Sequence, residues 1–132
     1  MIAMNQEEFL NHHIQVTTAA LNLAHDKTLA YSGEGNSVFS NFEKVEALRI
    51  CPTNVGILAR IADKVGRLAN YLNRSHNDVT INNSESFDDS ILDLINYLVF
   101  LHAYTIDTQA HDHQTEAEFT DELNRGYSQD RV

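Results

Sequence analysis

Acidic side chains recur at a regular spacing in residues 84–106. Glu85, Asp89 and Asp93 are four residues apart, so on an α-helix their carboxylates share one face. From residue 91 onward the segment is apolar nearly all round, which is typical of a helix buried on every side. A carboxylate there needs a cation or hydrogen-bond donors, because an isolated buried charge is costly. We therefore expect a metal ion or a basic partner at Asp89 and Asp93, the alternative being a solvated or capping stripe.

Basic side chains gather in the preceding segment, residues 55–73. Its apolar residues recur at helical spacing: Val55, Leu58, Ile61, Val65, Leu68 and Leu72. Basic residues lie opposite them, the last one directly after the segment: Arg60, Lys64, Arg67 and Arg74. A polar loop would join this helix to the acidic one as an antiparallel neighbour, with Lys64 and Arg67 within reach of the carboxylates. The pattern predicts a phosphate-binding row, or else a solvated face on which Asp63 pairs with Arg67.

Two further helices are predicted upstream. Residues 5–8 resemble a capping box that opens a helix over residues 6–30. A second capping box at residues 40–43 opens a short helix with Val45 and Leu48 facing inward. On that short helix two glutamates, Glu43 and Glu46, are three residues apart and could share a metal ion or simply face water.

The sequence turns polar after residue 106. We expect a helical domain over residues 1–106 and a polar, acidic tail over residues 107–132. In that tail, residues 115–123 could form a short helix that ends near Gly126. Because no segment shows convincing strand alternation, the predicted fold class is all-α, a bundle of four or five helices with short connections.

The net charge of −10 restricts the partners. A nucleic-acid polymer or an anionic membrane would repel such a chain, whereas a small phosphorylated ligand could still bind local cations. The single cysteine, Cys51, cannot form an internal disulfide, and the N-terminus lacks the pattern of a signal peptide. No apolar run approaches the roughly 18 residues of a membrane span. We therefore expect a soluble, cytoplasmic protein without a membrane partner.

Two patterns resemble a known family. They are D-K-x-x-R-L at residues 63–68 and E-S-x-x-D-x-x-x-D-L-x-x-Y at residues 85–97. With Lys27, Tyr31 and the Asn41-Phe42 dipeptide, they resemble the "nucleotide modification associated domain 1" family of phages and bacteria. The likeness covers about residues 27–104, although Ala30 and Ser32 replace an Asp and a Gly of the family pattern. It implies the following nucleotide-binding residues: Lys27, Tyr31, Asn41, Lys64, Arg67, Asn96 and Tyr97.

That family is in turn similar to the MazG-like all-α nucleoside triphosphate pyrophosphohydrolases, whose paired helices hold magnesium through E-x-x-E and E-x-x-D motifs. Matching Asn96 to an asparagine of those enzymes places Asp89 on the E-x-x-D aspartate, with Glu85 one position away from its glutamate. The resemblance implies a fold of the MazG-like type, Mg²⁺ as cofactor, and Glu85, Asp89 and Asp93 as metal ligands. It also implies a homo-oligomer, a dimer or tetramer formed by pairing helices.

Our leading hypothesis is a nucleotide-binding hydrolase of phage or bacterial cytoplasm, a Mg²⁺-dependent nucleoside triphosphate (dNTP) pyrophosphohydrolase. Lys64 and Arg67 would hold phosphate oxygens while a metal-bound water attacks phosphorus. The alternative is a non-catalytic protein that sequesters a signalling or modified nucleotide, as in a phage response to host defence, and needs fewer carboxylates. A third hypothesis uses the pairs His25-Asp26 and His111-Asp112, a dipeptide typical of metal phosphohydrolases, with His113 beside the second pair.

Overall fold

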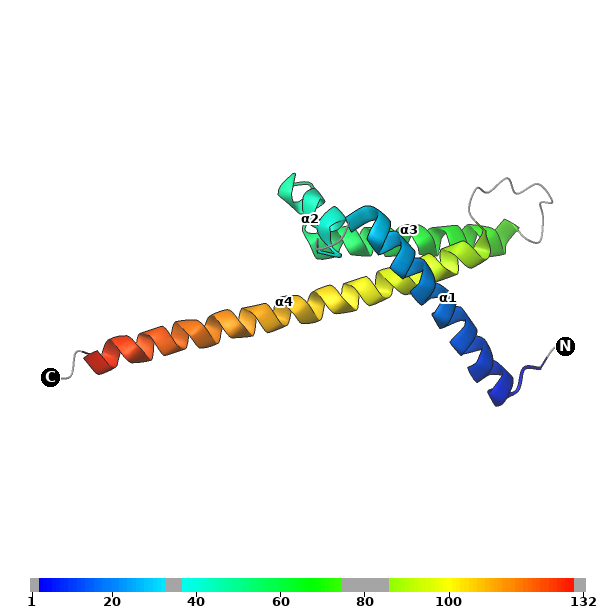
Figure 1. Cartoon of the computed structure of the whole chain (residues 1–132). Helices are drawn as coiled ribbons and strands as arrows, with labels where there is room; N and C mark the ends of the chain where they lie inside the picture. Colours follow the sequence, from blue (N-terminus) through cyan, green and yellow to red (C-terminus); the bar gives the residue numbers. More distant parts are fainter. Residues whose placement is uncertain (1–2, 33–36, 75–85, 130–132) are drawn as a thin grey trace. The chain divides into compact units, whose positions relative to one another are not determined.

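The computed structural model describes residues 3–32, 37–74 and 86–129, leaving out the side chains of residues 30–32 and 127–129. These residues form four helices and contain no strand, which confirms the predicted all-α class (Figure 1). The helices are α1 (Gln6–Ser32), α2 (Ser40–Ala47), α3 (Thr53–Arg74) and α4 (Phe87–Gln129). The chain divides into two units, Met1–Leu101 and His102–Val132, and each is described by itself.

The capping box predicted at the start of α1 is present. The Asn5 side chain accepts a hydrogen bond from the Glu8 backbone N–H at 2.9 Å, and the Glu8 carboxylate accepts one from the Asn5 N–H at 3.0 Å. Two backbone donors at the helix start are thereby satisfied, which stabilises α1 at its first turn. The helix then ends two residues beyond the predicted end.

The start of α2 differs from the prediction. Its N-cap is Phe39, which makes no side-chain cap bond, and Ser40 lies already in the first turn. The Ser37 hydroxyl accepts from the Phe39 N–H and donates to the Glu43 carboxylate. Because the Phe39 ring is buried edge-on against Phe100, aromatic packing sets the start of this helix rather than a capping box. Farther along, Val45 is half-buried as predicted, but Leu48 follows the helix and is exposed.

α3 buries a different face from the predicted one. Ile57 and Lys64 are buried. Four of the six residues predicted to face inward are about half exposed: Val55, Leu58, Val65 and Leu72. Lys64 turns inward because its ammonium group finds a carboxylate on α4, while its long apolar stem can lie against neighbouring side chains. The helix is therefore rotated about its axis relative to the expected orientation, by roughly one residue position, or about 100°.

α3 and the first part of α4 run antiparallel, as predicted. Tyr71, near the end of α3, stacks on Phe87 at the start of α4 with ring centroids 4.8 Å apart. Lys64, two turns earlier on α3, meets Asp93 farther along α4. Contacts that advance in opposite directions along two helices define an antiparallel pair.

α1 and α2 complete the first unit by packing against α4. The Asn96 side chain donates to the Ala20 backbone carbonyl at 3.0 Å, and Ala20 is almost completely buried. The small side chain of Ala20 lets α1 approach α4 closely. From α2, the Phe42 ring packs edge-on against Tyr97 and Phe100. The core is thus a small group of aromatic and aliphatic side chains that pack against the face of α4 carrying Asn96, Tyr97 and Phe100.

The second unit is helical throughout its described length. α4 continues through residue 106 and past Gly126 to Gln129, so the predicted separate helix over residues 115–123 is wrong. Threonine hydroxyls at Thr108, Thr115 and Thr120 donate to carbonyls four residues back. Such bonds satisfy polar side chains without interrupting a helix. Among the described residues of the whole chain, no helix is both long and apolar enough to cross a membrane.

Candidate ligand-binding site

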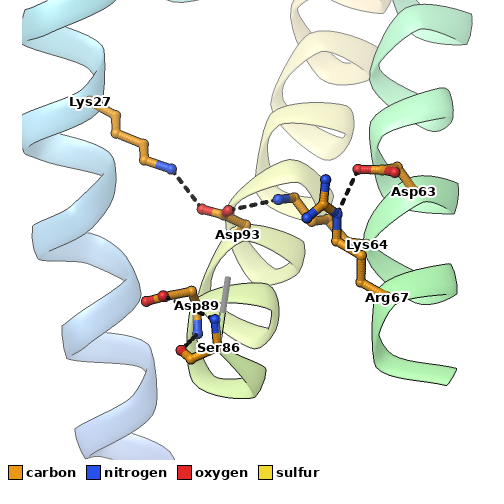
Figure 2. Close-up of polar contacts among 7 residues, drawn as sticks. All are labelled: Lys27, Asp63, Lys64, Arg67, Ser86, Asp89 and Asp93. Carbon is orange, nitrogen blue, oxygen red and sulfur yellow. Dashed lines mark hydrogen bonds and ion pairs between the residues drawn. The ribbon is translucent and has the colours of Figure 1, made fainter. Parts of the chain in front are cut away.

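Asp93 lies at the centre of an ion cluster that joins three helices. One carboxylate oxygen accepts a hydrogen bond from Lys27 Nζ of α1 at 2.8 Å, and the other lies 3.0 Å from Lys64 Nζ of α3 (Figure 2). The Asp93 and Lys64 side chains are only 12% and 10% exposed, whereas Lys27 is 45% exposed. We call these three residues the lysine bridge. The prediction that Asp93 has a cationic partner inside the helix pair is confirmed.

Burial and charge act in opposite directions on the bridge. Burial of the Asp93 carboxyl alone would raise its pKa, but hydrogen bonds from Lys27 and Lys64 stabilise the anion and leave the pKa lowered. Burial alone would lower the pKa of Lys27, but its hydrogen bond to Asp93 outweighs this and raises it. Both groups are therefore charged at neutral pH.

Asp89 and Arg67 make the contacts that the alternative hypotheses predicted for them, a helix cap and an ion pair on a solvated face. The Asp89 carboxylate accepts from the Ser86 N–H, and its own N–H donates to the Ser86 hydroxyl, which is a capping box at the start of α4. Arg67 Nε donates to Asp63 at 3.3 Å, the pairing expected for a solvated face. Figure 2 shows Asp89 directed to Ser86, and Arg67 to Asp63. In this structure Asp89 is thus an exposed cap residue.

A cavity of about 770 Å³ adjoins the bridge within the first unit. Side chains from all four helices line it, and one part of its lining is aromatic: Phe42, Tyr97 and Phe100, here called the aromatic wall. The three rings meet edge-to-face through Phe42, with centroids 6.1–6.3 Å apart. Charged groups form another part of the lining: Lys27, Arg60, Asp63 and Asp93.

The cavity brings together five of the residues predicted for the site: Lys27, Asn41, Asp93, Asn96 and Tyr97. Lys64 reaches it only through its contact with Asp93. Asn96 uses its amide N–H on the Ala20 carbonyl and so positions α1 against α4. The Tyr31 side chain and Glu85 lie outside the described residues.

Several residues of the lining were not assigned to the site from the sequence. Phe42 and Phe100 join Tyr97, and Arg60 and Asp63 add a cation and a carboxylate. The signal for the aromatic wall was present, because Tyr97 and Phe100 are three residues apart and share a helix face. Arg60 belonged to the predicted basic row, but its spacing alone does not distinguish an arginine that lines a cavity from one that faces solvent.

Carboxylates are dispersed rather than clustered in the described part of the chain. No group of three or more His, Cys, Asp or Glu side chains lies there in a position to share a metal ion. Glu43 bonds to Ser37, and Glu46 accepts from Thr53. Asp63 and Asp93 do line the same cavity, which is a donor pair of the hard oxygen type.

The two histidine–aspartate pairs belong to different units. His25 and Asp26 contact each other at 3.4 Å on the exposed side of α1. His111, Asp112 and His113 are exposed in the second unit. The hypothesis of a histidine–aspartate metal site therefore receives no support from the described contacts.

No family model matches the chain, and neither a curated protein nor a solved structure shows significant similarity to it. The resemblance to the nucleotide modification domain and to the MazG-like enzymes therefore stays a prediction.

Proposed function

We propose that the chain binds a nucleotide in the cavity beside the lysine bridge. One observation carries the proposal: the aromatic wall and Lys27 line the same cavity. Aromatic rings stack on nucleobases, and ammonium groups bind phosphates, so both ends of a nucleotide find a partner there. The volume of about 770 Å³ falls within the range of about 300–1,000 Å³ that is usual for small-ligand sites.

The charges of the lining support an anionic ligand. Two cations, Lys27 and Arg60, balance two carboxylates, Asp63 and Asp93, among the described lining residues. The chain as a whole carries a net charge of −10. An approaching phosphate is therefore repelled less at this cavity than by the acidic surface elsewhere.

Within the bridge, Lys27 is the residue suited to contact phosphate. Its side chain is 45% exposed and lines the cavity, whereas Lys64 is 10% exposed. Because Asp93 is shared by two ammonium groups, Lys27 can exchange the carboxylate for a phosphate oxygen while Lys64 stays on Asp93. In this proposal Asp93 positions Lys27, and Lys64 holds Asp93 in place.

Two versions of this function differ in whether the nucleotide is turned over. Sequestration without catalysis is supported by Asp93, both of whose oxygens already contact ammonium groups. Mg²⁺-dependent pyrophosphohydrolysis is supported by the second lining carboxylate, Asp63, because Mg²⁺ is commonly held by one or two carboxylates together with substrate phosphates. Asp63 and Asp93 would hold the ion, which when bound supplies charge neutralisation at the phosphates.

The binding proposal can be tested with a panel of dNTPs, NTPs, cyclic nucleotides and ADP-ribose-type nucleotides, measured by isothermal titration calorimetry without Mg²⁺. We expect Lys27→Met to weaken binding by about 10- to 100-fold, the loss of one hydrogen bond between charged groups. Lys44→Met is the matched control, since Lys44 is exposed on α2 and does not line the cavity. Absence of binding across the panel, or equal effects of both variants, contradicts the proposal.

Turnover is measured on the same panel with Mg²⁺ present. Release of pyrophosphate or phosphate that depends on Asp93 supports the hydrolase. Recovery of a tightly bound nucleotide unchanged supports the sequestering protein.

A further inference from the structure

An exposed apolar repeat runs along α3. It consists of Val55, Leu58, Ala62, Val65, Ala69 and Leu72, which follow one another at alternating intervals of three and four residues. This is the a/d spacing by which two helices interlock side chains, and it extends over about 26 Å of helix. All six residues are exposed, and the four larger ones are 47–57% exposed. We call this set the α3 seam.

The seam is separate from the face of α3 that forms the protein interior. That interior face carries Thr53, Ile57 and Lys64, which are all buried. At about 100° per residue, the middle of the seam lies roughly 110° around the helix from Ile57. The cavity-lining Arg60 and, two turns later on the same side of the helix, Arg67 lie on the opposite flank. α3 therefore has a buried face and, separate from it, an exposed apolar face.

The positions that border the seam indicate its occupant. On both sides of the six residues the neighbours are uncharged: Asn54, Ala59, Ile61, Gly66, Leu68 and Asn73. In coiled coils, charged side chains at these border positions determine which helix a given helix pairs with. A seam without such charges is complementary to itself, and it lets two copies that each carry a net charge of −10 meet where neither presents a carboxylate.

The small residues of α3 favour close approach of a second helix. Ala62 and Ala69 alternate with larger seam residues, so side chains of one helix can fit between those of another. At the border, a Cβ added to Gly66 would meet no atom within 4 Å, which shows open space beside the backbone. A helix with the same alternation fits this profile.

We propose that two copies of the chain pair through the α3 seam to form a two-fold symmetric dimer. In such a dimer the same patch is used on both copies, and Val65, near the middle of the seam, lies close to the centre of the interface whether the helices run parallel or antiparallel. The proposal does not depend on nucleotide binding, because none of the six seam residues lines the cavity, which among the border residues reaches only Ala59.

Sedimentation equilibrium of the 132-residue chain tests the proposal. We expect a dimer for the unchanged protein and a dissociation constant at least about tenfold higher for Val65→Glu, since a carboxylate would be desolvated in the interface. Leu21→Glu is the matched control, because Leu21 is equally apolar and 68% exposed on α1. That variant should dimerise normally. Leu58→Glu is a second seam variant, and far-UV circular dichroism verifies that each variant is folded.

A mixing experiment identifies the surface opposite the seam. Val65→Glu and Val65→Lys should each be monomeric alone and should form a dimer when mixed, because opposite charges then meet across the interface. A monomeric unchanged protein at every concentration reached, or folded seam variants that dimerise like the unchanged protein, would overturn the proposal. Failure of the mixture to associate would also overturn it, since the seam would then face a different surface.

Discussion

Replacing Asp93 by Asn removes the central charge of the lysine bridge while preserving the shape of the side chain. The contact with Lys64 dominates the expected loss, because both side chains are nearly buried, and a hydrogen bond between such charged groups contributes about 1.5–3 kcal/mol. The contact with Lys27 adds less than about 1 kcal/mol, since Lys27 is 45% exposed and solvent screens the pair. We therefore expect Asp93→Asn to lower the free energy of unfolding by about 2–3 kcal/mol.

Urea and thermal unfolding, followed by far-UV circular dichroism, measure this loss. The melting temperature should fall by roughly 8–12 °C, at about 4 °C per kcal/mol for a chain of this size. Asp63→Asn is the matched control. It removes the same charge from a pair in which both side chains are 47% exposed, and should cost at most about 0.5 kcal/mol.

A double-mutant cycle with Lys64→Met tests whether the two residues act through each other. The double variant should lose less stability than the two single variants added together, by about 1 kcal/mol or more, because each single change already breaks the same contact. Equal losses for Asp93→Asn and Asp63→Asn, or strict additivity in the cycle, would refute the assignment of Asp93 as the centre of the bridge.

Two further predictions follow from the pKa shifts and from the backbone. Asp93 has a lowered pKa, so its stabilisation is complete above its unfolded-state pKa of about 3.9 and is lost as the pH falls through the lower folded-state pKa. Lys27 has a raised pKa, so its stabilisation is complete below about pH 10.4 and is lost as the pH rises through the higher folded-state pKa. The difference in melting temperature between the unchanged protein and Asp93→Asn should hence be constant from about pH 5 to 9 and shrink under strong acid; a difference that persists there contradicts the reasoning. Arg49, which follows the C-cap residue Leu48 of α2, has a φ of 59°, a left-handed conformation that costs a non-glycine residue about 1 kcal/mol. Arg49→Gly should therefore raise the unfolding free energy by about that amount in urea titrations. Lys44→Gly, inside α2, should lower it by a similar amount, and a destabilised Arg49→Gly would show that the arginine side chain contributes more than the backbone strain costs.

Local patterns predicted the features that depend on neighbours in sequence. The capping box at Asn5 and Glu8 and the pairing of Asp63 with Arg67 involve residues three or four apart, so helical geometry alone fixes them. The antiparallel arrangement of α3 and α4 was predicted from a polar connection of roughly ten residues between two apolar helical segments. The cationic partner of Asp93 followed from the cost of leaving a carboxylate uncompensated in an apolar helix.

Features that depend on tertiary contacts were not predictable in the same way. Lys64 reads as a surface residue by its type, and only the position of Asp93 on α4 makes its burial favourable. Once Lys64 turns inward, α3 rotates and the expected core residues Val55, Leu58 and Val65 become exposed. The uninterrupted α4 was missed for a different reason. A glycine in a polar segment usually indicates the end of a helix. A glycine inside a helix nevertheless costs only about 1 kcal/mol, and α4 continues past Gly126.

The hydrogen bond from Asn96 to the Ala20 carbonyl limits how a ligand can reach Lys27. The amide holds α1 at one backbone atom, so α1 cannot slide along α4 without breaking that contact. Lys27 follows seven residues later, two turns along the same face. Its backbone therefore moves with the anchored segment as a rigid body. The ammonium group of Lys27 therefore reorients by rotation about the bonds of its four-carbon stem. These rotations are fast compared with displacement of a helix.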